Sequence, residues 1–190
     1  MLGSRRLLFV FLFFQFVSLS GYSQQLGSTG LRNLDGKPVK LSSLHKKLTA
    51  IVFLSPECPL SENYTLVLNR LQQQFHESTE VVGVFPGKSY SVEEYVAFSK
   101  KYKIRFLLLT DSAKKLSGQL NATVTPEVFL VDRNNNLVYS GAIDNWVVDL
   151  GKKRAAATEH YLAAAISACN KNEPIIVPHT KAVGCFINDL

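Results

Sequence analysis

Apolar residues along the chain fall into short continuous runs that alternate with segments of helical spacing. Residues 50–54 form an apolar, partly β-branched run that ends at a turn signal, which predicts a buried strand. Beyond the turn, apolar residues recur at helical spacing from Leu60 to Phe75 and predict a helix with one apolar face. Pro59 suits the first position of that helix, so Cys58 falls at its N-cap.

The same alternation continues along the rest of the chain. Asp35-Gly36 predicts a β-hairpin within residues 31–44, and Ser91 with Glu94 matches a capping box that begins a helix. The other expected elements are strands at residues 80–85, 104–110, 126–132 and 137–141, helices at residues 92–102, 113–120 and 153–170, a loop at residues 144–151 and an extended tail at residues 171–190. This alternation predicts an α/β fold in which a mixed central sheet has helices on both faces.

Residues 1–23 have the composition of a secretory signal peptide. Arg5 and Arg6 precede an apolar segment at residues 7–17, and small and polar residues follow it. The apolar segment is shorter than the roughly 18–20 residues that a spanning helix needs, which favours cleavage over a retained anchor. We therefore expect a signal peptide at residues 1–23, one domain at residues 24–170, a tail containing Cys185 at residues 171–190, and no stable membrane anchor.

Charge and cysteine content narrow the class of protein. The 190 residues carry a formal net charge of +6, but no basic tract is interleaved with aromatic residues, so nucleic-acid binding is not expected. A cleaved leader would make the mature protein secreted or periplasmic, where disulfides persist. The odd set of cysteines, Cys58, Cys169 and Cys185, suits one reactive thiol better than a structural disulfide framework.

Cys58 is the main candidate for chemistry. At an N-cap, its sulfur faces unpaired N–H groups and the positive end of the helix dipole, which favour the reactive thiolate. The alternative is that Cys58 is a small buried apolar residue. Cys185 lies in a tail that we expect to be flexible enough to reach Cys58, although an unpaired thiol or a static disulfide is equally compatible with the sequence. Cys169 is expected to be buried on the inner face of the last helix.

Four segments carry a resemblance to a known family: residues 34–41 (LDGKPVKL), residues 53–61 (FLSPECPLS), Thr125-Pro126 and residues 181–187 (KAVGCFI). Over residues 26–190 the chain resembles the redoxins, which comprise the alkyl hydroperoxide reductase/thiol-specific antioxidant group and related secreted thioredoxin-like proteins. The resemblance implies a thioredoxin fold, with an N-terminal hairpin before the sheet. It also implies a cis peptide bond at Thr125-Pro126 that faces the reactive cysteine.

Two positions differ from the patterns of that family. Ser61 stands where Cys-x-x-Cys members carry their second cysteine, so the usual dithiol within the turn cannot form. Ser55 and Cys58 fit the spacing of peroxiredoxins, but Ile51 stands where that pattern has proline. A second thiol, from Cys185 or from another molecule, must therefore complete any redox cycle at Cys58.

These observations define a predicted site and three functional hypotheses. The site consists of the catalytic candidates Cys58 and Cys185, and of the substrate-contacting candidates Ser55, Pro59, Ser61, Thr125 and Pro126. The leading hypothesis is a secreted or periplasmic thiol–disulfide oxidoreductase with a single active-site cysteine. It would act on protein thiols or disulfides with an external thiol reductant and no cofactor. The alternatives are a peroxiredoxin-like antioxidant peroxidase that acts on peroxide, and a non-enzymatic binding module that carries copper on Cys58, Cys185 and His179.

Overall fold

The computed structural model describes residues 26, 29–44 and 46–187, so the predicted signal peptide lies outside the described residues. A six-stranded mixed sheet forms the centre, in the order β1-β4-β3-β2-β6-β7. Its strands are β1 (Arg32–Asn33), β2 (Leu48–Phe53), β3 (Thr79–Pro86), β4 (Leu107–Asp111), β6 (Glu127–Asp132) and β7 (Leu137–Gly141). β2 is parallel to β3 and antiparallel to β6, while β3 and β4 are parallel.

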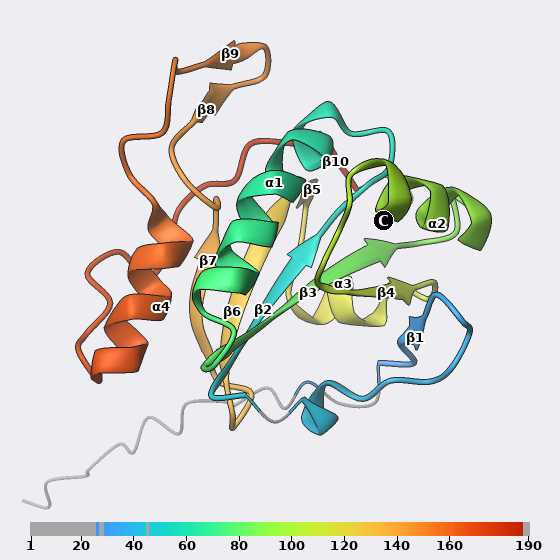
Figure 1. Cartoon of the computed structure of the whole chain (residues 1–190), viewed down its shortest axis with the longest axis horizontal. Helices are drawn as coiled ribbons and strands as arrows, with labels where there is room; N and C mark the ends of the chain where they lie inside the picture. The colour runs from blue at the N-terminus through green and yellow to red at the C-terminus, as the bar shows by residue number, and fades with distance from the viewer. Residues whose placement is uncertain (1–25, 27–28, 45, 188–190) are drawn as a thin grey trace, which may run out of the picture.

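Helices cover both faces of this sheet, as predicted (Figure 1). They are η1 (Leu41–Ser43), α1 (Pro59–Gln74), α2 (Val92–Lys101), α3 (Lys115–Gln119) and α4 (Tyr161–Lys171). All six residues of β2 are buried, and their side chains alternate between two cores. Ala50 and Val52 pack with α1, α2 and α4 on one face, whereas Ile51 and Phe53 pack with α3 and the N-terminal segment on the other. This two-sided burial is why the strand reads as a continuous apolar run.

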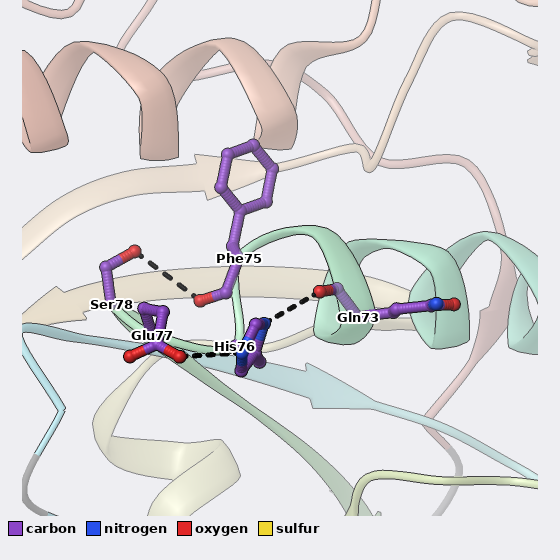
Figure 2. A network of polar contacts seen from close by, with 5 residues as sticks. All are labelled: Gln73, Phe75, His76, Glu77 and Ser78. Carbon is purple, nitrogen blue, oxygen red and sulfur yellow. Dashed lines mark hydrogen bonds and ion pairs between the residues drawn. The ribbon is translucent and has the colours of Figure 1, made fainter.

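The first helix follows the sequence pattern at both ends. Cys58 is its N-cap and Pro59 its first residue. At the other end, the Phe75 carbonyl accepts a hydrogen bond from the Thr79 N–H at 2.8 Å, which turns the chain into β3. Figure 2 shows the side chains of this turn, where His76 Nδ1 donates to the Gln73 carbonyl at 3.0 Å and Nε2 lies 2.7 Å from a Glu77 carboxylate oxygen. The helix therefore ends at its C-cap Phe75 through these turn contacts, without the glycine that often follows a helix.

Other local predictions are confirmed with small shifts. The capping box is present, since the Ser91 side chain accepts from the Glu94 N–H and the Glu94 carboxylate accepts from the Ser91 N–H. The N-terminal hairpin is present in a short form, in which the Val39 N–H donates to the Leu31 carbonyl at 3.0 Å. The predicted strand at residues 104–110 begins later, at Leu107.

The region before the last helix differs from the prediction. Residues 144–151, expected as a loop, contain β8 (Val147–Asp149), which pairs with β9 (Lys152–Lys153). The helix expected from residue 153 begins at Tyr161. Asn145 holds the intervening chain in a non-helical path, because its side-chain oxygen accepts hydrogen bonds from the Thr158 and Glu159 N–H groups at 2.8 and 3.1 Å. These bonds outweigh the helix propensity of the alanines at positions 155–157.

The tail was expected to be extended and loose, and the structure shows it extended but attached at two places (Figure 1). It first runs beside the end of β7, where the Thr180 N–H donates to the Ser140 carbonyl at 3.0 Å. It then forms β10 (Cys185–Phe186), which pairs antiparallel with β5 (Val124–Thr125). Among the described residues, no helix is long and apolar enough to cross a membrane.

Gly141 permits the first attachment of the tail. Its φ is +123°, and a Cβ atom at this position would overlap the Thr180 carbonyl oxygen and lie 2.6 Å from the Thr180 hydroxyl oxygen. We expect Gly141→Ala to loosen residues 178–187 and to lower the free energy of unfolding by about 2 kcal/mol or more, because the clash is with backbone. Thermal unfolding and limited proteolysis of the tail measure both effects.

The control for this prediction is Gly151→Ala, because Gly151 also has positive φ (+75°) but nothing lies within 4 Å of the added Cβ. The control reports the cost of placing alanine at a positive φ where no atom obstructs the added Cβ. Equal loss of stability in the two variants, with no added cleavage of the tail in Gly141→Ala, would contradict the proposed role of this contact.

Candidate active site

The Cys58 thiol lies buried at the junction of three elements. The residue is 1% exposed and occupies the N-cap of α1 directly after the turn that follows β2. Its Sγ donates to the carbonyl oxygen of Thr125 in β5 at 3.0 Å. Its Sγ also lies 2.6 Å from the Sγ of Cys185 in β10, and both cysteines are free thiols. The structure therefore brings together the two sulfurs that the sequence analysis selected.

Cys185 is brought there by backbone pairing with β5. In the antiparallel register, Cys185 lies opposite Thr125 and Phe186 lies opposite Val124. The Thr125 hydroxyl donates to the Cys185 carbonyl at 3.4 Å, and the Ile187 N–H donates to the Thr123 carbonyl at 3.0 Å. A regular strand pair, rather than random motion of a flexible tail, thus sets the distance between the two sulfurs.

Gly184 allows the two backbones to approach this closely. A Cβ atom at this position would overlap the Thr125 carbonyl oxygen and lie 3.2 Å from the Thr125 nitrogen. Both obstacles are backbone atoms, which cannot move aside as a side chain can. The residue before Cys185 must therefore be glycine for β10 to keep its register against β5.

The Thr125-Pro126 peptide bond is cis, as the family resemblance implied. Both residues are buried, and Thr125 contacts both cysteines through its backbone. Pro59 lies exposed beside Cys58 at the start of α1. Of the predicted substrate-contacting residues, Thr125 contacts the sulfur pair, Pro59 adjoins Cys58, and Pro126 follows Thr125 through the cis bond.

The hydrogen bonds around Cys58 favour its ionised form. Burial acts to raise the pKa of the Cys58 thiol, but hydrogen bonds from the Cys185 thiol and from the backbone and side chain of Ser61 outweigh it, so the pKa lies below its usual value. Burial and the neighbouring Cys58 sulfur raise the pKa of Cys185. The first proton to leave the pair therefore comes from Cys58, and the Cys185 thiol stays protonated and donates a hydrogen bond to the Cys58 thiolate.

Ser61 and Ser55 have different roles in this arrangement. Ser61 is fully buried, hydrogen-bonds Cys58 and accepts from the Ser55 N–H through its hydroxyl at 3.2 Å. Ser61 thus supports the sulfur from the first turn of α1. The Ser55 hydroxyl instead donates to the Tyr90 hydroxyl at 3.4 Å, and Tyr90 donates to the Glu57 carboxylate at 3.2 Å.

Tyr90 is the residue at this site that the sequence analysis missed. It lies in the loop after β3 and half-buried beside the Cys58 turn, where it links Ser55 to Glu57. Burial and the Glu57 carboxylate raise the pKa of the Tyr90 hydroxyl, so it remains a hydrogen-bond donor at neutral pH. The sequence offered one indirect indication of Tyr90. β2 and β3 are parallel neighbours, so the loops that follow them, which contain Cys58 and Tyr90, lie at the same edge of the sheet.

The remaining candidates lie apart from the sulfur pair. Cys169 is half-buried on α4 against the main core, and burial raises the pKa of its thiol, in line with the packing role predicted for it. His179 Nδ1 lies 2.8 Å from the Ser140 hydroxyl beside β7. In the part of the chain that the structure describes, no three His, Cys, Asp or Glu side chains are grouped so as to hold a metal ion.

Similarity to solved proteins defines the class of the fold. A hypothetical protein of Sinorhizobium meliloti 1021 is similar with a TM-score of 0.71 and 23% identity, over 83% of this chain and 88% of that chain. A secreted disulfide oxidoreductase of Mycobacterium tuberculosis, homologous to E. coli DsbE, is similar with a TM-score of 0.56 and 18% identity, over 74% of this chain and 97% of that chain. The fold is thioredoxin-like, as predicted.

The AhpC/TSA family model matches residues 23–140, and the chain belongs to that family. Chloroplastic peroxiredoxin Q of Sedum lineare is 29% identical over 121 residues, which are 58% of this chain and 63% of that relative. The chain thus spans less than two thirds of the length of this relative. The family match includes Cys58, Thr125 and Pro126, whereas Cys185 lies beyond it.

The lowered pKa of Cys58 gives a test of the sulfur contact. Cys185→Val keeps the bulk over Cys58 but removes the thiol that donates to it. We expect the pKa of Cys58 in the reduced protein to rise in this variant, so its thiolate forms at higher pH. The measurement is the ultraviolet absorbance of the thiolate against pH.

Cys169→Val is the matched control, because Cys169 lies on α4 and packs against the core. It should leave the titration midpoint of Cys58 in place. A midpoint for Cys58 that is unchanged or lower in Cys185→Val would show that the Cys185 thiol does not stabilise the Cys58 thiolate.

Proposed function

We propose that this protein is a thiol–disulfide oxidoreductase in which Cys58 is the nucleophile and Cys185 is the resolving thiol. The observation that carries this proposal is the 2.6 Å contact between the two sulfurs, with the lower pKa on the one at the helix N-cap. The two sulfurs are adjacent, so an S–S bond can form between them. Cys185 thus supplies the second sulfur that Ser61 does not.

The reaction needs only these thiols and their partners. The Cys58 thiolate attacks one sulfur of a substrate disulfide, whose S–S bond breaks, and the departing thiolate takes a proton. The Cys185 thiol then loses its proton and attacks Cys58 Sγ, so the mixed disulfide breaks and the second substrate thiolate leaves. Two electrons pass from the cysteine pair to the substrate, and a Cys58–Cys185 disulfide remains. An external thiol reductant returns the pair to the reduced state, and no cofactor takes part.

The surrounding residues have supporting roles in this scheme. Ser61 donates a hydrogen bond to the Cys58 sulfur. This bond stabilises the thiolate, both when Cys58 attacks a disulfide and when it leaves one. Pro59, Thr125 and Pro126 would contact the substrate around Cys58. Ser55 would act less directly, because its hydroxyl points to Tyr90.

We also propose that the protein works outside the cytoplasm, secreted or in a periplasm. The composition of residues 1–23 supports this location, and a disulfide-forming pair is suited to an oxidising compartment. The similar Mycobacterium tuberculosis protein is described as secreted, which is compatible with it.

A peroxidase is the second candidate function, favoured by the peroxiredoxin Q relative. The Cys58 thiolate would attack a peroxide oxygen, the O–O bond would break, and Cys58 would become a sulfenic acid as water or an alcohol leaves. Cys185 would then condense with the sulfenic acid to give the same disulfide and one water. The Ser55 hydroxyl, directed to Tyr90 rather than to the sulfur, gives less support to this reaction.

Three serine substitutions test the proposed roles of the cysteines. We expect Cys58→Ser to reduce turnover of a disulfide-bonded reporter protein to background. Cys185→Ser should retain the first attack but accumulate a mixed disulfide on Cys58, because no resolving thiol follows. Cys169→Ser, the matched control, should keep nearly full activity because that thiol packs against the core. Reporter reduction and intact mass measure these outcomes.

Activity that survives in Cys58→Ser would contradict the proposal, as would full turnover in Cys185→Ser without a trapped intermediate. Repeating the assays with hydrogen peroxide separates the two candidates. Oxidation of Cys58 by peroxide that is much faster than that of a small free thiol, with slow reporter reduction, would favour the peroxidase.

A further inference from the structure

The strand β10 covers the sulfur on which the proposed function depends. Cys58 is 1% exposed, and Cys185 in β10 contacts it directly. A substrate disulfide must come within bonding distance of Cys58 Sγ to react. β10 therefore has to leave its place before an external disulfide can reach the nucleophile.

The departure of β10 would expose a strand edge. β5 and β10 form a two-stranded sheet of their own, separate from the six-stranded sheet. Without β10, the hydrogen-bonding groups of β5 on this side lose their partners in the described part of the chain. An open edge of this kind accepts another extended segment by strand addition. Here the edge is next to Cys58, since the carbonyl oxygen of Thr125 accepts from its thiol.

The tail can release this edge without leaving the protein. Its other attachment, at β7, uses separate hydrogen bonds: the Ser140 N–H donates to the Pro178 carbonyl, and the Thr180 N–H donates to the Ser140 carbonyl. Residues 181–183 join the two attachments. Opening of a two-residue strand is a small local event compared with unfolding, so β10 can leave and return while the rest of the tail stays in place.

The sequence of β10 indicates what the edge selects. The position before the cysteine is limited to glycine, because a Cβ atom there would overlap the Thr125 carbonyl oxygen. The position after the cysteine is unrestricted, since Phe186 is 72% exposed. The next position favours an apolar side chain, because Ile187 is buried in the second core.

We propose that β10 occupies the place of a substrate strand, and that the partner is a protein with an extended segment in which glycine directly precedes the disulfide-bonded cysteine. This inference rests on the proposed function and names its substrate class. The partner segment pairs with β5 while its disulfide reacts with Cys58. The return of β10 then brings Cys185 to the mixed disulfide and displaces the partner from both the sulfur and the strand edge. Resolution and product release thus become one event.

Three peptides test the selection. Each is based on Lys-Ala-Val-Gly-Cys-Phe-Ile, the sequence of residues 181–187, with its cysteine activated as a 2-thiopyridyl disulfide. The second peptide has alanine in place of glycine, and the third has alanine in place of phenylalanine. The full chain carrying Cys169→Ser and Cys185→Ser keeps Cys58 as its single thiol, so release of 2-thiopyridone reports attack by Cys58.

We expect the alanine-for-glycine peptide to react about tenfold more slowly or worse, because its Cβ meets the Thr125 backbone. The alanine-for-phenylalanine peptide should react at nearly the rate of the parent.

Equal rates for all three peptides would overturn strand addition at β5 but leave the proposed function standing. No release from any of them, nor from 2,2′-dithiodipyridine, would contradict the proposed function itself. Wild-type dimers that join Cys58 of one chain to Cys185 of another would assign the edge to a second copy and overturn the assignment to a partner protein.

Discussion

The pairing of β10 with β5 is the interaction on which the sulfur site depends. Thr125 connects this pairing to the nucleophile, since its backbone pairs with Cys185 and its carbonyl oxygen accepts a hydrogen bond from the Cys58 thiol. The missing side chain of Gly184 lets the two backbones meet. One short strand pair therefore sets the distance between the sulfurs, covers Cys58 and, together with Ser61, lowers the pKa of Cys58 below that of Cys185. It gives the helix N-cap a second sulfur even though the turn itself ends in Ser61.

This arrangement couples reactivity to access. The contact that lowers the pKa of Cys58 also shields its sulfur from solvent, so the more acidic thiol of the pair is kept under a strand that must move before a substrate arrives. The tail meets both requirements because its two attachments use separate hydrogen bonds. The contact between Thr180 and β7 keeps Cys185 close, which gives it a high effective concentration for resolving a mixed disulfide, while the shorter β10 is free to exchange.

Much of the scaffold follows from local sequence signals, and the completed site does not. Periodicity and the position of Pro59 predict β2, α1 and the N-cap placement of Cys58, because each depends on neighbouring residues. The late start of α4 was missed because Asn145, a residue from a preceding loop, holds residues 158–159 by its side chain. The pairing of β10 with β5 was missed as well. A strand of two residues is too short to show an alternating pattern in the sequence, so nothing indicates that residues 185–186 pair with residues 124–125. The sequence shows a glycine at position 184, but the reason for it, the close approach of the Thr125 backbone, appears only in the structure.

The central claim is that Cys58 and Cys185 form one redox pair within a single chain. The most direct test is a peptide mass map of the oxidised monomer, alkylated and digested without reductant. The account predicts a fragment in which Cys58 is disulfide-linked to Cys185, together with an alkylated Cys169. Alkylation of both Cys58 and Cys185 after oxidation, or a bond from Cys58 to Cys169, would contradict it.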